Sequence, residues 1–421
     1  MAALRSRTAY VMVAAVGWMV GWAVWACDLH TPWEDRMYFH LMEMRPAPAV
    51  RDTGLVQIKV QDMTDEPWPW PHLDYAILLH ALAPYQPEVL ALDLPLDVAD
   101  TLQPVYERQL ARQMKAFRDV VLSAKPSLQV KPTPAPPGLD PLPSDGFTRK
   151  LAEIGSVRWP IEAYWSNCRI SPTGVAGSAS GRVPLVFRMA DTVVPSFPLV
   201  IYGKSIGAYW PHCELVSGSS IILRDYQKKV MARIPVDARG CLRLQPAKRI
   251  PPPVEVEFYT VVLSAEQKHQ ETRPLFELDR LRRQVVLVSL EHPDTASQTP
   301  TPEGSAYPGT LTGRVLQQLF LREYWGPVPP LVSVLLFMVC AIIATWAGSL
   351  PQILHGLAAL AGGFLFLAVD AWFALHFLDL TLPLGSMATS VLAAWSLAIA
   401  WTAFSTEKAP APAASPPSGG V

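Results

Sequence analysis

The chain has 421 residues, of which 50% are hydrophobic and only 17% are charged, and its mean hydropathy is +0.20. Its formal net charge of -1 provides no basic surface of the kind that nucleic-acid-binding proteins use, so no nucleic-acid partner is expected. This composition is too apolar for an ordinary water-soluble enzyme. It predicts a membrane protein with one sizeable water-exposed domain.

Four apolar segments are long enough to be transmembrane helices, since about 20 apolar residues cross a bilayer. The first, residues 9–27, follows a predicted cytoplasmic N-terminus at residues 1–8 that contains Arg5 and Arg7. The other three lie near the C-terminus, at residues 329–350, 353–377 and 383–404, before a predicted disordered cytoplasmic tail at residues 405–421.

The positive charges set the predicted orientation. Arg5 and Arg7 place the N-terminus in the cytoplasm, so with four spans residues 28–328 form an extracytoplasmic domain. We therefore expect a multi-pass protein of a bacterial inner membrane with its main domain in the periplasm. The first segment exceeds the apolar core of a cleavable signal peptide, which favours a retained anchor. Lipidation at Cys27 is a weaker alternative, because Trp25 fits a lipoprotein cleavage site poorly.

The exported region begins with alternating strand and helix patterns. Apolar strand patterns occur in LVQIKVQD, PEVLALDLPLDV and DVVLSAKP, and helical patterns occur at residues 73–83 and 105–117. This alternation predicts an α/β domain with a mostly parallel sheet. Residues 125–145 are rich in proline and are predicted to form an exposed loop.

Further strands follow the proline-rich segment. A β-hairpin is predicted within SSIILRDYQKKVMARIPVDARGCLRLQPA, with MARIPV and CLRLQP around residues 237–240. A buried strand in RRQVVLVSLEHPD and a helix in PGTLTGRVLQQLFLREYW complete the domain. The predicted fold class is thus an exported α/β domain, with a mostly parallel sheet plus a hairpin, and four transmembrane helices.

The five cysteines have no metal-binding spacing, and no metal is predicted. Cys168, Cys213 and Cys241 lie in the exported region, where oxidation is permitted. A disulfide between Cys213 and Cys241 is one interpretation. The other is that all three are unpaired small hydrophobic side chains.

Several short motifs follow one another through the exported region. They are Trp68-Pro69-Trp70-Pro71, Leu92-Asp93-Leu94-Pro95-Leu96, Ile234-Pro235-Val236-Asp237 with Gly240, Val285 to Val288, Asp294, Thr299-Pro300 and Pro308-Gly309. In this order they resemble the type-2 CHASE domain, an extracellular sensor found on bacterial adenylyl cyclases, histidine kinases and diguanylate cyclases. The arrangement of one apolar segment before the domain and three after it is also similar to that family.

The resemblance has departures. Ser289 stands where the family usually has glycine, and TLTG follows Pro308-Gly309 where an acidic residue and a histidine are common. The family's cytoplasmic output domain is not expected here, because the tail after residue 404 is short and rich in small residues and proline.

Candidate site residues gather after the first predicted strands. Asp62, Asp65, Glu66, Asp93, Asp97 and Asp100 follow two strands of an open sheet, where ligands collect. We predict a ligand site formed by Trp68, Trp70, His72, Asp93, Asp294 and Thr299. The alternatives are that the carboxylates cap helices and that the tryptophans pack inward as a lid on the core. No catalytic motif is present in the sequence, so no catalytic residue and no cofactor are predicted.

The sequence therefore predicts a non-catalytic, membrane-bound sensor or binding module. It would recognise an unknown small-molecule or envelope ligand and pass a signal through its transmembrane helices to a separate output protein. The predicted partners are a homo-oligomer or a membrane protein that carries the output domain. A structural scaffold of a cell-envelope complex is the alternative, and a periplasmic enzyme is third. Asp370 and His376, within an apolar segment, are predicted to form interhelical hydrogen bonds.

Overall fold

A computed structural model describes residues 2–27, 31–45, 52–61, 70–100, 103–127, 136, 139, 141–146, 148–173, 181–291, 298–328, 330–349, 353–377 and 380–407. The chain divides into two compact units. The helical unit comprises Met1–Met37 and Val328–Val421, and the sensor unit comprises Tyr38–Pro327. Helix α2 (Thr31–Glu43) includes the boundary between them.

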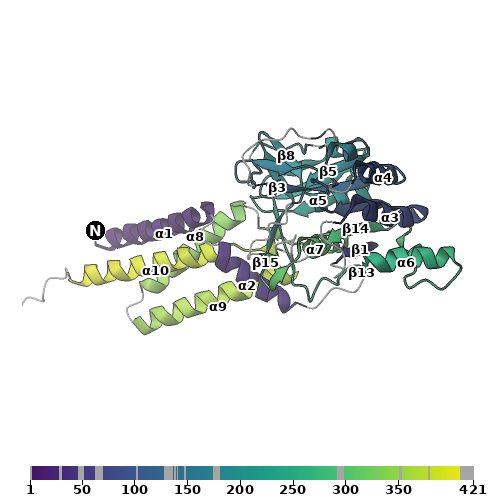
Figure 1. Cartoon of the computed structure of the whole chain (residues 1–421). Helices are drawn as coiled ribbons and strands as arrows, with labels where there is room; N and C mark the ends of the chain where they lie inside the picture. The colour runs from purple at the N-terminus through teal and green to yellow at the C-terminus, as the bar shows by residue number, and fades with distance from the viewer. Residues whose placement is uncertain are drawn as a thin grey trace, which may run out of the picture. The chain divides into compact units, whose positions relative to one another are not determined.

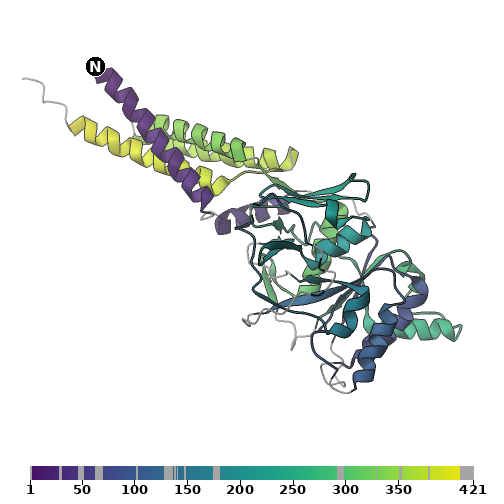
Figure 2. The ribbon, with the colours of Figure 1, turned by 90° about the horizontal axis from the view of Figure 1, so that it is seen from above.

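The helical unit contains four apolar helices, which run alongside one another in Figures 1 and 2. They are α1 (Ala2–Ala26), α8 (Pro330–Gly348), α9 (Ile353–Phe377) and α10 (Leu384–Glu407). Helices α1, α8 and α10 pack against one another, and α9 lies mainly against α8. Glycines let α1 approach α10 closely: a Cβ atom on Gly17 would lie 2.5 Å from that of Ala394. The hydroxyl of Ser390 also donates a hydrogen bond to the Gly17 carbonyl at 3.0 Å.

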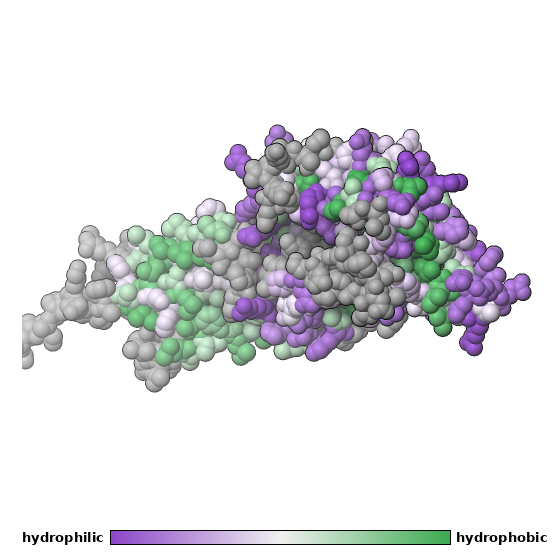
Figure 3. All heavy atoms as spheres, viewed as in Figure 1, coloured by the Kyte–Doolittle hydropathy of each residue, from purple (hydrophilic) through white to green (hydrophobic). Residues whose placement is uncertain are grey.

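The prediction of four spans was wrong in number, since two helices qualify by length and composition among the residues that the structure describes. These candidate spans are Thr8–Ala26 and Leu384–Trp401. The apolar parts of α8 and α9 that the structure describes, Leu331–Ala347 and Leu360–Ala371, are each shorter than 18 residues. All four are helical as predicted, and apolar residues cover most of the visible face of the helical unit in Figure 3.

The sensor unit is built on a parallel sheet with the strand order β13-β1-β14-β2-β3-β5. The strands are β13 (Val254–Glu257), β1 (Leu55–Val60), β14 (Val285–Leu290), β2 (Val89–Asp93), β3 (Val120–Ser127) and β5 (Cys168–Pro172). The short strand β4 (Ser156–Arg158) pairs antiparallel with the end of β3. The predicted α/β class with a mostly parallel sheet is confirmed.

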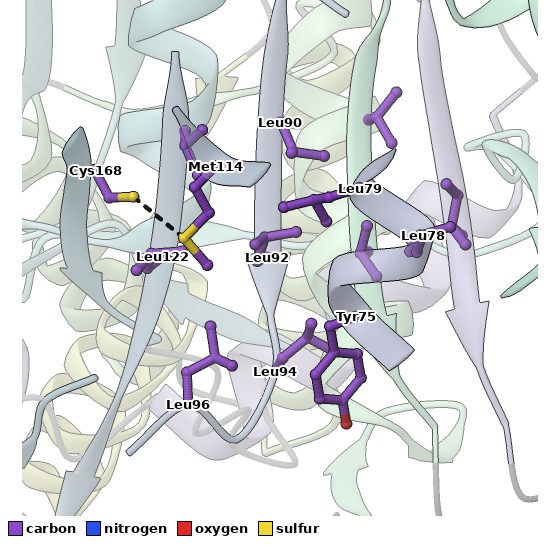
Figure 4. Close-up of a cluster of buried hydrophobic side chains, with 14 of the residues drawn as sticks. Tyr75, Leu78, Leu79, Leu90, Leu92, Leu94, Leu96, Met114, Leu122 and Cys168 are labelled. Atoms are coloured by element: carbon purple, nitrogen blue, oxygen red, sulfur yellow. Dashed lines mark hydrogen bonds between the residues drawn. The ribbon is translucent and has the colours of Figure 1, made fainter. Parts of the chain in front are cut away.

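Helices cover both faces of this sheet. On one face α3 (His72–Leu82), α4 (Pro104–Met114) and α6 (Phe258–His269) bury Leu79, Leu110 and Val261 in one hydrophobic core. Figure 4 shows part of this core, where leucines of α3 lie over those of β2. On the other face α5 (Phe197–Ser205) and α7 (Pro308–Leu321) bury a second core that contains Phe197 and Leu311.

Smaller β-elements lie outside the main sheet. They are β6 (Arg182–Pro184), β7 (Val186–Met189), β8 (Thr192–Pro195), β9 (Glu214–Val216), β10 (Ser220–Arg224), β11 (Val230–Pro235), β12 (Cys241–Arg243), β15 (Thr299–Thr301) and β16 (Gly304–Ala306), with the two-residue strands β17 (Gly326–Pro327) and β18 (Leu380–Thr381) in the chain's later part. The described residues also form four short 3-10 helices, η1 (Ala83–Tyr85), η2 (Glu162–Asn167), η3 (Trp210–His212) and η4 (Leu278–Leu281).

Two sequence predictions about this region need correction. The hairpin forms between β10 and β11, whereas CLRLQP does not continue it, because β12 pairs with β6 instead. The predicted loop at residues 125–145 begins too early, because Lys125, Pro126 and Ser127 extend β3 and pair with β4. In both cases the observed structure depends on pairing with a strand that is distant in the sequence, β6 for β12 and β4 for the end of β3. Local sequence does not encode such pairing.

Candidate functional site

A row of polar side chains crosses the α5/α7 face of the sheet near the carboxyl ends of the strands. Ser289 of β14 is in register with Lys59 of β1 on one side and Asp93 of β2 on the other, and Ser123 of β3 is in register with Ser171 of β5. We call Lys59, Ser289, Asp93, Ser123 and Ser171 the polar row.

The alternation of each strand places the row on this face. In β2, Leu90 and Leu92 belong to the core beneath α3 and α4, whereas Val89 and Ala91 belong to the core beneath α5 and α7. Asp93 shares the orientation of Val89 and Ala91, because alternate residues of a strand face the same side. The row therefore lies where the apolar core beneath α5 and α7 ends.

Asp93 is the acidic member of the polar row. Its side chain is buried, with 6% of the residue exposed. Burial raises the pKa of the Asp93 carboxyl, although the nearby ammonium of Lys125 and the Ser123 hydroxyl act in the opposite direction. A buried carboxyl in this state can accept a hydrogen bond when ionised and donate one when protonated.

Lys59 is the basic member, and two carboxylates hold it. Its Nζ lies 2.7 Å from Glu255 Oε2 and 3.3 Å from Glu291 Oε2. Burial alone would lower the Lys59 pKa, but the hydrogen bonds and charges of the two glutamates outweigh burial and raise it. Lys59 is therefore a fixed cation at one end of the polar row.

Helix α7 rests on the same part of the sheet through two glycines. A Cβ atom on Gly309 would lie 2.5 Å from Cβ of Ser289, and one on Gly313 would collide with the side-chain oxygen of Gln57. The hydroxyl of Thr310 donates to Glu291 Oε1 at 2.6 Å. The first turns of α7 thus pack directly on the polar row and its glutamate.

Gln57 of β1 connects this strand to β14 beneath α7 by a side-chain hydrogen bond. Its residue is fully buried, and its Nε2 donates to the Ser289 hydroxyl at 2.8 Å. Its Oε1 has no hydrogen-bond partner among the residues that the structure describes. A buried acceptor left in this way costs about 1–3 kcal/mol. The contact between α7 and the sheet is therefore polar at its centre and incompletely satisfied.

A second buried polar group lies at the N-termini of α3 and α4. The Tyr164 hydroxyl lies 2.7 Å from His72 Nδ1, and the His72 backbone N–H donates to Asp100 Oδ2 at 2.7 Å. The Asp100 backbone N–H in turn donates to Glu107 Oε1 at 2.8 Å. Burial lowers the pKa of His72, and the charges of Asp100 and Glu107 only partly oppose this.

Trp70 packs inward in the structure. It is 3% exposed and makes edge contacts with Phe258 and Tyr259, at ring-centroid distances of 5.3 and 5.7 Å. It belongs to the core that contains α3, together with Tyr75. Its position agrees with the inward-packing alternative.

The other predicted site residues are not brought together. Asp93 faces α5 and α7, whereas His72 and Trp70 lie with the α3 and α4 core, and Thr299 belongs to the separate pair β15–β16. Trp68, Asp294, Asp62, Asp65 and Glu66 lie outside the described residues. Asp97 pairs with Arg158, with Asp97 Oδ2 lying 3.4 Å from Arg158 Nη1.

Sequence reasoning missed most of the polar row. Lys59, Ser123 and Ser289 of the row, and Gln57 beside it, are polar positions inside the largely apolar strands LVQIKV, VVLSAKPS and VVLVSL. Because strands buried on both faces are usually apolar throughout, these interruptions were the available signal.

The predicted disulfide does not form in the structure. The Cys213 thiol is a free, buried group that accepts the backbone N–H of Arg224 at 3.4 Å. Burial raises the pKa of the Cys213 thiol, although the backbone hydrogen bond and the charge of Arg224 act in the opposite direction. Cys241 lies at the start of β12, paired in register with Pro184 rather than placed against Cys213.

The fold and site define an α/β domain joined to apolar helices that include a candidate membrane span before it and one after it. The CHASE2 domain family matches residues 11–347 of the chain, and the chain therefore belongs to this family. Neither a curated protein nor a solved structure matches it.

Membership in the family confirms the coarser part of the sequence prediction. CHASE2 domains are generally extracytoplasmic sensory modules and are typically non-catalytic. Together with the two candidate spans, this indicates a membrane-anchored protein whose CHASE2 domain lies outside the cytoplasm.

Proposed function

We propose that the protein senses a small polar ligand at the polar row and passes the signal through its membrane helices to a separate output protein. The observation that carries this proposal is the close packing of α7 on the sheet beside the polar row. Gly309 and Gly313 bring α7 against Ser289 and Gln57, and the chain leads from the end of α7 at Leu321 to the start of α8 at Pro330. One helix thus connects the row in sequence to the helical unit.

The chemistry of the row supports a ligand rich in hydroxyl, amide or amine groups. Asp93 and the three serines of the row can form hydrogen bonds with a ligand. Lys59 and Glu291 place a positive and a negative charge at the β1 end of the row. A parallel sheet with helices on both faces commonly binds ligands outside the carboxyl ends of its strands, and the row lies within the strands near these ends. Ligand binding beside Ser289 would act on the α7 contact directly.

The test is a thermal-shift screen of the full chain in detergent with a library of small polar metabolites. A ligand that binds only the folded state at 100 times its Kd stabilises that state by about 2.7 kcal/mol. We expect Asp93→Asn to abolish the shift produced by a compound that binds the wild type.

Asp119→Asn is the matched control, because Asp119 precedes β3 at the opposite, amino edge of the same sheet. Its carboxylate pairs with Lys204 at 2.8 Å, away from the polar row. We expect this variant to keep the ligand shift even if its own melting temperature falls. An equal loss in both variants, or no loss in Asp93→Asn, would count against the polar row as the ligand site.

A further inference from the structure

Helix α9 carries an acidic residue in an otherwise apolar stretch. Asp370 lies about two turns before the end of α9 at Phe377, between Val369 and Ala371. Helix α9 packs against α8 and, to a smaller extent, against α10, which contains a candidate span. An ionisable side chain in such a setting is costly unless something pairs with it.

The described side chains of α9 divide into two faces. Leu367, Ala371 and Leu375 are buried among the helices of the unit, whereas Leu365 and Val369 are 67% and 55% exposed. At 100° per residue, Asp370 lies on the flank between these faces, on the same side as Gly363. Asp370 is partly exposed, and a Cβ atom on Gly362 or Gly363 would meet nothing within 4 Å.

The apolar helical segments of this chain offer no Lys or Arg to pair with Asp370. Lys and Arg do not occur in the sequence of α1 from Thr8 onward, nor in α8, α9 or α10. A second copy of the chain would therefore bring another Asp370 and no Lys or Arg to the contact. His376 is six residues from Asp370 along α9, a spacing that places the two on different sides of the helix.

We infer that the Asp370 flank of α9 docks a membrane helix of a different protein, one that presents a Lys or Arg at the same depth. The open glycine surface lets the backbone of that helix approach, and the opposite charge pairs with the carboxylate. This inference rests on the proposed function, in which a separate protein receives the signal, and it names the surface and chemistry of that contact.

The experiment uses the full chain in phosphatidylcholine vesicles. The probe is a labelled 22-residue Leu/Ala transmembrane peptide with one Arg about two turns from its end, and the reference peptide has Leu at that position. Energy transfer from the labelled chain measures association. Interhelical polar contacts of this kind predict that the Arg peptide binds roughly 3- to 30-fold more tightly than the Leu peptide.

Variants of the chain separate charge from packing. Asp370→Asn should bring binding of the Arg peptide down to that of the Leu peptide, and Asp370→Glu should retain most of the preference. Glu407→Gln is the matched control, because it removes one negative charge at the end of α10 and should leave the preference unchanged.

Equal binding of the two peptides to the wild type would overturn the inference. So would a preference that survives Asp370→Asn, or a wild-type chain that self-associates through Asp370 and releases its own copy in that variant. None of these outcomes involves the polar row. The ligand shift in the sensor unit would still be measured by the Asp93→Asn screen, so failure of the docking inference and failure of the ligand site are distinguishable.

Discussion

Replacing Gly309 by alanine should separate α7 from the polar row. A Cβ at this position would lie 2.5 Å from Cβ of Ser289 and 2.8 Å from its Oγ. Ser289 belongs to β14, which pairs with β1 and β2 on its two sides, so its Cβ cannot move without moving a central strand. Overpacking a well-filled interior costs about 1–3 kcal/mol.

Little should offset this cost. Gly309 lies at the second position of α7, where the gain in helix propensity from alanine is small because the turn is only beginning. We therefore expect Gly309→Ala to lower the free energy of unfolding of the sensor unit by about 1–3 kcal/mol, measured by urea denaturation of the full chain in detergent.

A double-mutant cycle identifies the collision. Ser289→Gly removes the atom that the new methyl group meets, so Gly309→Ala should cost at least about 1 kcal/mol less in that background. Gly155→Ala is the control, because a Cβ there meets nothing within 4 Å, and we expect a change within about 0.5 kcal/mol. The reasoning fails if Gly309→Ala is as stable as the wild type, or if its cost is the same with and without the Ser289 side chain.

Three other outcomes follow from described contacts. Trp70 packs on Phe258 and Tyr259 in the core, so Trp70→Ala should lower the free energy of unfolding by about 3–5 kcal/mol. Trp70→Phe keeps an aromatic ring and should cost clearly less. Equal costs of the two variants in a denaturant titration would contradict this. Burial lowers the His72 pKa in the folded state, so the unfolded chain takes up a proton on this side chain at a higher pH than the folded chain does. The free energy of unfolding should therefore fall as the pH drops below about 6.5. If the His72→Gln variant shows the same dependence of stability on pH, that dependence comes from other groups. Gly17→Leu should disrupt the α1–α10 contact at Ala394 and lower the melting temperature of the helical unit, whereas Gly362→Leu, where a Cβ meets nothing within 4 Å, should not.

Local patterns were sufficient for part of the sheet and its helices, whereas strands β5 and β13 and helices α5 and α6 were not predicted. The alternation in LVQIKV and the apolar run in VLALD each correspond to a strand, and the helix predicted at residues 73–83 is α3 (His72–Leu82). Each of these signals comes from residues that are neighbours in the chain, and the periods of strands and helices differ enough to be distinguished.

Features that depend on distant pairing could not be predicted in the same way. β12 pairs with β6 across about 60 residues of sequence, which no hairpin pattern encodes. The polar row assembles from the five strands β1, β2, β3, β5 and β14, and only the sheet order places Ser289 between Lys59 and Asp93.

The role of the aromatic residues near the predicted ligand site was also ambiguous from the sequence. Trp70 follows a proline-rich segment before α3, a position that suits either a ligand contact or core packing. The deciding contacts come from Phe258 and Tyr259 in α6, almost 190 residues later in the chain. The number of candidate spans differs for another reason, because the apolar runs that the structure describes in α8 and α9 are shorter than 18 residues.

The location of the CHASE2 domain is tested most directly by labelling an exposed residue of the sensor unit. Tyr226, 76% exposed, lies in the turn between β10 and β11, so Tyr226→Cys presents a thiol on the domain surface. We predict that a membrane-impermeant maleimide labels this variant in intact spheroplasts well above the wild-type chain, which reports the background from Cys27 and the other native cysteines. Labelling that exceeds the wild type only after the membrane is lysed would place the domain in the cytoplasm and contradict an extracytoplasmic sensor.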